Sequence, residues 1–293
     1  MSSLSIPFYA DAAILPAELP SIDEIQASPE VFLDYGSRKV VGVGQHFIVK
    51  FGPQVDITEG EVLFFLQRST SIRAPKLYAL FKDPSNPNKN FIIMERIPGK
   101  TLEAEWVSMD QSAKNSIARK LREVFEEIKR LPSPGSYCNP MRGPLLDNLF
   151  WTDNRSESID GPFETEEDLN YALVKKASYN NLPTERVGYY RRHLPHVLRG
   201  HPPIFTHGDF QKKNVIVYPT SNLNNDNNVS PEYEVVLIDW EFAGWYPCYW
   251  EYSRAINSCG TWADDWGSWV DKILDPFPNE SVWMGVIISE LWS

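Results

Sequence analysis

The sequence predicts an α+β fold of two lobes, a small β-rich first lobe and a larger, mostly helical second lobe. Residues 39–44 and 46–52 have the pattern of a β-hairpin, with Gly44 and Gln45 near its turn. Apolar side chains recur at helical spacing over residues 112–131. Because Pro98 and Gly99 interrupt regular structure between these patterns, we place the domains at residues 1–97 and 98–293.

Two further elements are predicted in the first lobe. Residues 58–70 indicate a helix, with Thr58 as its N-cap and Glu61 three positions on, as in a capping box. Residues 75–99 indicate two strands joined by a polar loop rich in Pro and Asn. The proline and glycine at 98 and 99 end the second of these strands.

The second lobe is predicted to be mostly helical. The amphipathic helix over residues 112–131 is defined by its apolar positions Ile117, Leu121, Val124, Phe125, Ile128 and Leu131. A second helix begins with a capping box from Thr165 to Asp168. Two apolar strands, 214–218 and 234–240, flank a polar insertion at 219–232.

Composition limits the possible partners. The chain has 293 residues and a formal net charge of −11, and no basic patch with interleaved aromatics appears, so nucleic acid is excluded as a partner. The three cysteines form no CxxC pair, which suits a reducing compartment. The N-terminus lacks a basic region followed by an apolar run, and no apolar run could span a bilayer. We expect a cytoplasmic protein with no membrane partner.

The stretch "FTHGDFQKKNVIV" places His207, Gly208, Asp209 and Asn214 in a tight segment before an apolar strand. It can be read as an ordinary polar loop or as a phosphoryl-transfer loop. Phosphoryl transfer needs charge neutralisation, metal ions and a base that positions the attacking hydroxyl. Asp239 ends a second apolar strand, and pairing of the two strands would bring it close to Asn214 as an oxygen-rich metal pocket.

Two charged residues of the first lobe can supply the remaining parts. Lys50 lies on a predicted strand, where its ammonium could reach α- and β-phosphates. Glu61 lies on the following helix, where its carboxylate could pair with that lysine. Each residue alone would usually be a solvated surface charge. The order of lysine, glutamate, HxDxxxxN and an apolar strand ending in aspartate favours the catalytic reading.

At these motifs the chain resembles the aminoglycoside phosphotransferase and choline kinase-like family. "HGDFQKKN" and "VVLIDWEFAGW" are similar to the family's catalytic loop and metal-binding strand, and "SIRAPKLYAL" and "FIIMERIPGKTL" to its interlobe strand and hinge. The resemblance runs from about Lys39 to Tyr252 and is closest to fungal-type members, whose substrates are mostly unassigned. It implies a protein-kinase-like fold, with the nucleotide-binding lobe following an N-terminal extension within 1–97, and the catalytic loop and acceptor site within 98–293.

The resemblance also implies a role for each matching residue of the catalytic loop and of the metal-binding strand. Asp209 would be the catalytic base that orients the acceptor hydroxyl. Asn214 and Asp239 would hold Mg²⁺. His207 would be structural, with its ring hydrogen-bonded within the loop.

The residues that would bind the nucleotide lie in the first lobe. Lys50 would contact the phosphates and pair with Glu61, which matches the family better than its rival Glu59 by its distance from Pro75. The adenine would be held at the hinge by the carbonyl of Glu95 and the N–H of Ile97. Met94 would pack behind the base.

The resemblance therefore implies a kinase that uses ATP (or GTP) and Mg²⁺ to phosphorylate a hydroxyl of a small molecule. Two alternatives remain, a catalytically weak or inactive pseudokinase-type binding module and a protein kinase. "VVGVGQH" is not a GxGxxG motif, so we expect a reduced or missing flap over the phosphates. The Trp-rich C-terminal region would be core, or with Asp264 and Asp265 a cage for a cationic acceptor.

Overall fold

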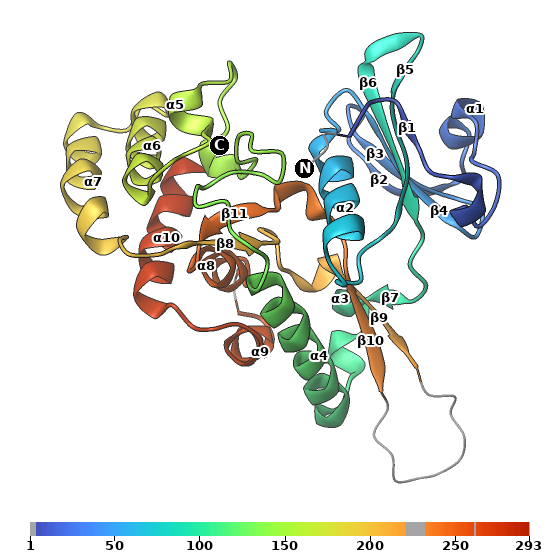
Figure 1. The fold of residues 1–293 in the computed structure, drawn as a ribbon. Coiled ribbons are helices and arrows are strands. Elements are labelled where there is room, and N and C mark those ends of the chain that lie inside the picture. The colour runs from blue at the N-terminus through green and yellow to red at the C-terminus, as the bar shows by residue number, and fades with distance from the viewer. Residues whose placement is uncertain (1–3, 221–231, 261, 293) are drawn as a thin grey trace. The chain divides into compact units, whose positions relative to one another are not determined.

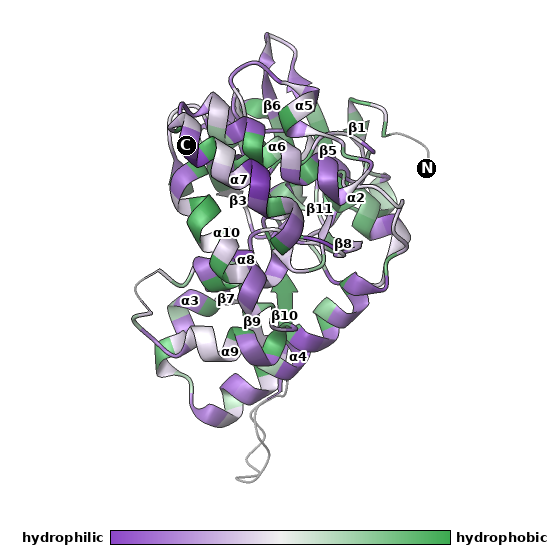
Figure 2. Ribbon diagram, turned by 90° about the vertical axis from the view of Figure 1, so that its left-hand side faces the viewer, coloured by the Kyte–Doolittle hydropathy of each residue, from purple (hydrophilic) through white to green (hydrophobic). Residues whose placement is uncertain are grey.

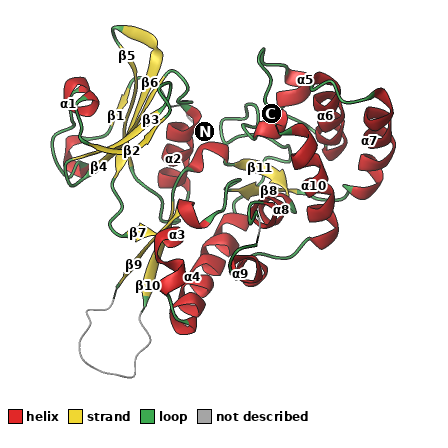
Figure 3. Cartoon of the chain, turned by 180° about the vertical axis from the view of Figure 1, so that it is seen from behind, coloured by secondary structure: helices red, strands yellow, loops and turns green. Residues whose placement is uncertain are grey.

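The structure is a computed structural model that describes residues 4–220, 232–260 and 262–292. The chain forms two compact units. Unit 1 comprises Met1–Lys100 and Val236–Glu241, and unit 2 comprises Thr101–Val235 and Phe242–Ser293. Strands predominate in unit 1 and helices in unit 2 (Figures 1 and 3), which confirms the predicted α+β fold. Most of the predicted polar insertion, residues 221–231, lies outside the described residues.

Unit 1 is built on one antiparallel sheet of six strands in the order β1-β5-β6-β4-β3-β2. The strands are β1 (Phe8–Tyr9), β2 (Glu30–Asp34), β3 (Lys39–Val43), β4 (Phe47–Gly52), β5 (Leu77–Asp83) and β6 (Asn86–Glu95). The predicted hairpin over residues 39–52 is confirmed as β3 and β4, in which Val41 lies opposite Val49. The two strands predicted within 75–99 are confirmed as β5 and β6.

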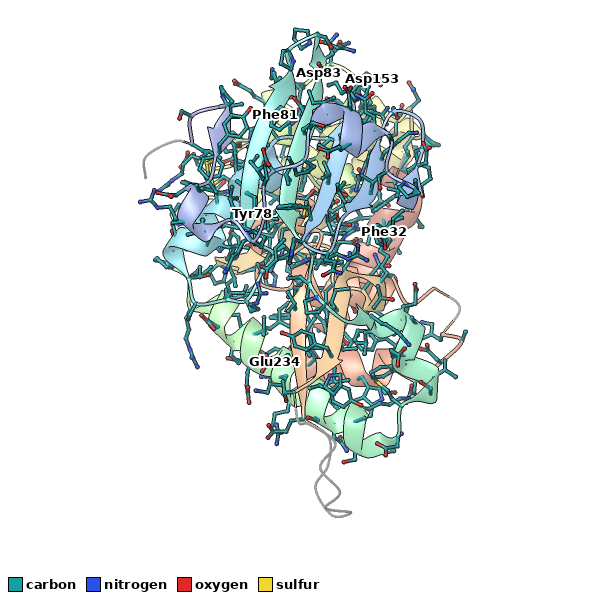
Figure 4. All side chains as sticks on the ribbon, turned by 90° about the vertical axis from the view of Figure 1, so that its right-hand side faces the viewer. Phe32, Tyr78, Phe81, Asp83, Asp153 and Glu234 are labelled. Atoms are coloured by element: carbon teal, nitrogen blue, oxygen red, sulfur yellow. The ribbon has the colours of Figure 1, made fainter. Side chains whose placement is uncertain are left out.

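The alternation of side chains along β4 decides what each face of the sheet contains. Phe47, Val49 and Phe51 point to a core that includes Ile25 of α1 (Ile22–Gln26). Tyr78 and Phe81, labelled on β5 in Figure 4, belong to the same core. Ile48 and Lys50 alternate with these residues and therefore point to the opposite face.

Helix α2 (Thr58–Ser69) packs against the face of the sheet that carries Lys50 (Figure 1). A Cβ atom at Gly60 would lie 2.9 Å from a methyl group of Leu80, so the absence of a side chain allows this close packing. The helix is predicted, but its N-cap is wrong. Thr58 is the first helical residue, and the Asp56 carboxylate caps it by accepting from its N–H at 2.9 Å.

Strand β2 was not predicted, because no regular apolar pattern precedes residue 39. Val31, Phe32 and Tyr35 are exposed, so burial gives this edge strand no periodicity (Phe32 is labelled in Figure 4). The strand forms by antiparallel pairing with β3, with Glu30 opposite Gly42 and Asp34 opposite Lys39. A β2–β3 hairpin therefore precedes the strand of Lys50, so the flap is not missing; that it is reduced stays a prediction.

Unit 2 is mostly helical. Its helices are α3 (Leu102–Glu105), α4 (Gln111–Lys129), α5 (Glu157–Asp160), α6 (Glu166–Tyr179), α7 (Thr184–Val197), α8 (Trp250–Asn257), α9 (Trp266–Ile273) and α10 (Pro278–Leu291). Helix α4 confirms the predicted amphipathic helix and has separate hydrophobic and hydrophilic stripes (Figure 2). The predicted capping box of Thr165 and Asp168 is present at the start of α6.

Five short strands complete the fold. Strands β10 (Tyr233–Leu237), β9 (Val215–Pro219) and β7 (Lys100–Thr101) form one sheet in that order, which confirms the predicted pairing of the two apolar strands. Strands β8 (Pro203–Thr206) and β11 (Gly244–Pro247) pair antiparallel. In the parts of the chain that the structure describes, no helix combines the length and apolar character needed to cross a membrane.

Candidate functional site

The loop between β8 and β9 has a backbone shape that depends on glycine. Gly208 has φ +86°, in the left-handed region, and a Cβ there would lie 2.8 Å from the carbonyl oxygen of Phe242. His207 before it is completely buried. The loop ends in a 3₁₀ turn, Lys212–Asn214, which leads directly into β9.

Asp209 and Asn214 lie side by side in this loop. The Asn214 side-chain amide donates to the Asp209 carbonyl at 2.9 Å and to its carboxylate at 2.8 Å. Gln211 donates to the other carboxylate oxygen, and Lys213 Nζ lies 3.5 Å from the first. None of these bonds uses Asn214 Oδ1, the oxygen that could bind a metal. The carboxylate is thus oriented by two neutral amides and retains 13% of its side-chain exposure.

Further hydrogen bonds hold the backbone of this loop in place. His207 Nδ1 accepts from the Asp209 N–H at 3.2 Å, which agrees with the loop-bonding position expected for this ring. Glu251 of α8 accepts from the N–H groups of His207 and Gly208, at 2.6 and 3.3 Å. Glu251 was not predicted as a site residue, because nothing in "YWEYSRA" distinguishes a loop-binding carboxylate from a solvated one.

Glu251 is a buried carboxyl group with an incomplete set of partners. Burial is the largest cause that raises its pKa to about 7, and the nearby Asp209 carboxylate raises it further. Its Oε1 atom has no hydrogen-bond partner among the residues that the structure describes. Glu251 therefore fixes the loop backbone at an electrostatic cost.

In unit 1, Lys50 lies at the centre of a cluster of carboxylates. Its Nζ donates to Glu59 at 2.7 Å and to Asp239. The Lys50 side chain is 9% exposed. Burial opposes its charge, but the carboxylates of Asp239 and Glu59 outweigh burial and raise its pKa above the ordinary value. Lys50 is therefore held as a cation whose direction is fixed.

The predicted pairing of Lys50 with Glu61 is wrong, because Glu59 occupies that position. The two glutamates are two residues apart on α2, or about 200° around the helix, so only one can face the sheet. Glu59 is 2% exposed, whereas Glu61 is half-buried and near Asp56. Glu59 was weighed in the sequence as the rival; only the rotation of α2 against the sheet distinguishes the two.

Asp239 follows β10 with φ +66°, a left-handed conformation that is uncommon for aspartate. Oxygen atoms of Glu59, Asp239 and Glu241 lie within 4.8 Å of one another and could hold a metal ion. Arg38, in the turn between β2 and β3, contacts both Glu241, at 2.9 Å, and Asp239, at 3.7 Å. Glu241 belongs to the quoted "IDWE" motif, but no role was predicted for it. Arg38 was not predicted as a site residue, because the β2–β3 hairpin was not predicted.

The hinge residues lie at the end of β6. Met94 is buried in the sheet and Glu95 is the last strand residue. The Glu95 carboxylate accepts from both terminal nitrogens of Arg73, at 2.7 and 2.8 Å, so this side chain is engaged away from any ligand. Ile97 follows the strand and is half-buried. The backbone groups of Glu95 and Ile97 remain the ones predicted to bind adenine.

The Trp-rich C-terminal region is core only in part, because Trp266 and Trp269 are buried whereas Trp262 and Trp292 are exposed. The side chains of Trp106, Trp266 and Trp269 are at most 4% exposed. Asp265 accepts from the Trp106 and Trp269 indoles at 2.8 and 2.9 Å and from Lys114 at 3.0 Å. Asp264 pairs with Lys212. Asp265 thus satisfies the indoles of Trp106 and Trp269, whereas the buried Trp266 Nε1 has no hydrogen-bond partner among the described residues.

A β-sheet unit and a mostly helical unit, as found here, are the two parts of a protein-kinase-like fold. The chain belongs to the phosphotransferase enzyme family, whose model matches residues 37–275. A search of curated proteins finds no match.

Solved aminoglycoside phosphotransferases have the same fold. The ADP-bound aminoglycoside phosphotransferase APH(2'')-Ib superposes with a TM-score of 0.54 and 16% identity, over 89% of this chain and 79% of that chain. The GDP complex of wild-type aminoglycoside 2'-phosphotransferase-IIIa gives a TM-score of 0.53 and 14% identity, over 89% and 81%. At these identities the likeness concerns the fold.

Proposed function

We propose that this protein transfers the γ-phosphate of ATP or GTP to a hydroxyl group of a small molecule. The observation that carries the proposal is the position of Lys50, buried between the Glu59 and Asp239 carboxylates. A buried lysine held in one direction is suited to bind phosphate oxygens, whereas a purely structural ion pair needs only one carboxylate.

The carboxylate cluster fits a divalent metal. Asp239 and Glu241 offer hard oxygen ligands at short mutual distance, as Mg²⁺ prefers, and an amide oxygen such as that of Asn214 is a ligand of the same type. Mg²⁺ bound by Asp239 and Asn214 would neutralise charge on the phosphates. Lys50 would hold the α- and β-phosphates, with Glu59 rather than Glu61 as the residue that keeps it in place.

Asp209 would act as the base. Its carboxylate would accept the proton of the acceptor hydroxyl while that oxygen attacks the γ-phosphorus. The bond from the γ-phosphorus to the bridging oxygen breaks, and the nucleoside diphosphate leaves. Asn214 and Gln211 would orient the carboxylate through the hydrogen bonds that their amides donate.

The nucleotide base would bind at the end of β6. The Glu95 carbonyl and the Ile97 N–H would face the adenine edge, and Met94 would pack behind the ring. The bidentate Arg73–Glu95 pair supports this assignment, since it removes the Glu95 side chain from the hinge and leaves its backbone available.

The acceptor would be a small hydroxylated molecule. The named structural relatives are aminoglycoside phosphotransferases, and the net charge of −11 would tolerate a cationic acceptor of that kind. The packed Trp106, Trp266 and Trp269 cluster gives no support to an aromatic cage built from these three rings.

Thermal shift with nucleotides tests the proposal. ATP or GTP should stabilise the protein only with Mg²⁺ or Mn²⁺, by about 2.7 kcal/mol at a hundredfold excess over Kd. Asp239→Ala should remove the metal-dependent part. Asp275→Ala, which removes an exposed carboxylate paired with Arg122 and Lys129, is the matched control and should behave like wild type. Equal stabilisation by nucleotide without metal, or in Asp239→Ala, would show that the metal assignment is wrong.

A further inference from the structure

Arg38 occupies the outer side of the metal-type carboxylate cluster of unit 1. One guanidinium nitrogen contacts both carboxylate oxygens of Glu241, at 2.9 and 3.1 Å, and another lies 3.7 Å from Asp239 Oδ1. Asp239 and Glu241 are two of the three carboxylates whose oxygens lie within 4.8 Å of one another. A metal ion bound by those oxygens would compete with the Arg38 guanidinium for the same lone pairs.

The two cations of the cluster differ in how firmly they are held. The Lys50 side chain is 9% exposed and bonded on two sides, whereas the Arg38 side chain is 25% exposed and lies on a turn. A guanidinium at this position can leave its carboxylates at low cost in exposed area, because its long stem reaches solvent. Lys50 has no such route, so Arg38 is the exchangeable cation.

The turn itself is anchored, so only the side chain of Arg38 needs to move. The N–H of Gln54 donates to the Ser37 carbonyl at 3.1 Å, and the Ser37 hydroxyl donates to the Gln54 side chain at 2.7 Å. Gly52 passes so close that a Cβ there would lie 2.2 Å from the Ser37 carbonyl oxygen. The Cα atom of Arg38 therefore stays near the cluster while its side chain changes partner.

We propose that Arg38 is a specificity-determining counter-ion that occupies the metal carboxylates Asp239 and Glu241 in the nucleotide-free protein and transfers to a phosphate when metal and nucleotide bind. The inference rests on the proposed function and adds a residue to it. Phosphate suits the second partner, because a guanidinium binds phosphate oxygens through parallel N–H bonds. Because of this exchange, the protein binds a metal ion weakly without nucleotide and tightly together with nucleotide.

Mn²⁺ binding without nucleotide is the direct test, measured from the electron paramagnetic resonance signal of free Mn²⁺. Arg38→Gln should bind Mn²⁺ about tenfold more tightly than wild type, since it removes a charge-assisted competitor. Lys39→Gln is the matched control, because it removes one positive charge from the next residue, whose partner Asp34 lies outside the cluster. Equal tightening in the two variants would mean that long-range charge is responsible, and would overturn the inference.

The second arm adds nucleotide. With Mn²⁺ and a non-hydrolysable ATP analogue, Arg38→Gln should bind the analogue about tenfold more weakly than Lys39→Gln. Unchanged analogue affinity would overturn the transfer to phosphate. Arg38→Lys, which keeps the charge, should stay close to wild type in the first arm, and its tightening to the level of Arg38→Gln would also contradict the proposal.

The two proposals fail in different ways. If no variant and no wild-type protein binds the metal–nucleotide complex, the proposed function is wrong and so is the transfer of Arg38 to phosphate. If wild type binds that complex but Arg38→Gln equals Lys39→Gln in both arms, the proposed function stands and the role of Arg38 is wrong.

Discussion

The charged cluster of unit 1 and the HGD loop of unit 2 both present an aspartate, but they hold it by different means. Asp239 is held by cations, Lys50 and Arg38, together with a left-handed backbone. Asp209 is hydrogen-bonded by the side-chain amides of Asn214 and Gln211, and its one ion-pair partner among the described residues, Lys213 at 3.5 Å, has a 49% exposed side chain.

The difference matches two kinds of chemistry. A group that binds phosphates and metal works with full charges that exchange partners. A base must keep its affinity for a proton, which a tight ion pair would lower. We therefore expect substitutions in the unit 1 cluster to change binding and substitutions at Asp209 to change rate.

The largest effect should come from Asp209→Asn. Turnover should fall about 10²–10⁴-fold, because the general base is lost while the shape of the side chain is kept. Nucleotide affinity and melting temperature should stay close to wild type. Steady-state kinetics with an acceptor, or with water as a slow substitute, measures this. A wild-type rate in Asp209→Asn would remove the distinction between the two regions.

The next effect concerns Glu251 and pH. Its pKa rises from 4.5 to about 7 on folding, so the folded protein binds this proton more tightly than the unfolded chain. The contribution of Glu251 to the free energy of unfolding therefore falls as pH rises from about 4.5 to about 7, by roughly 3 kcal/mol at 1.36 kcal/mol per pKa unit.

Glu251→Gln keeps an acceptor for the His207 and Gly208 N–H groups but cannot ionise. Denaturant unfolding at several pH values should show that Glu251→Gln gains stability relative to wild type as pH rises through this window. Parallel pH curves for the two proteins would contradict the buried, weakly partnered state of this carboxyl.

Gly208→Ala tests whether the loop depends on its backbone. The φ of +86° and the 2.8 Å approach to the Phe242 carbonyl oxygen should cost about 1–3 kcal/mol of unfolding free energy. Rate should fall as well, because Asp209 is the next residue. Gly36→Ala is a useful control, since Gly36 also has positive φ, +75°, but a Cβ there meets no atom within 4 Å. Equal losses in the two variants would assign the effect to φ alone.

The smallest effect is the coupling between Lys50 and Glu59 in nucleotide affinity. A double-mutant cycle of Lys50→Ala with Glu59→Gln should show a coupling of about 1 kcal/mol, modest because Asp239 also holds Lys50. The same cycle with Glu61→Gln should be additive. Coupling to Glu61 instead of Glu59 would contradict the rotation of α2 that the structure shows.

Much of the fold could be predicted, because it depends on periodic burial and on local turn chemistry. The β3–β4 hairpin, the strands β5 and β6, helix α4 and the pairing of β9 with β10 all have such signals. Strand β2 had no such signal, because an exposed edge strand is determined by its pairing with the neighbouring strand. Arg38 could not be assigned without that strand.

The sequence by itself determined which residue types are available for the chemistry: a lysine on a strand, an HGD loop with an asparagine five residues after its aspartate, and an aspartate that ends an apolar strand. Only the tertiary structure decided which of them pair. Glu59 and Glu61 differ by a rotation about one helix axis, and Glu251 and Arg38 reach their partners from 44 and 203 residues away in the chain. Such choices depend on packing between distant segments, for which local spacing contains no signal.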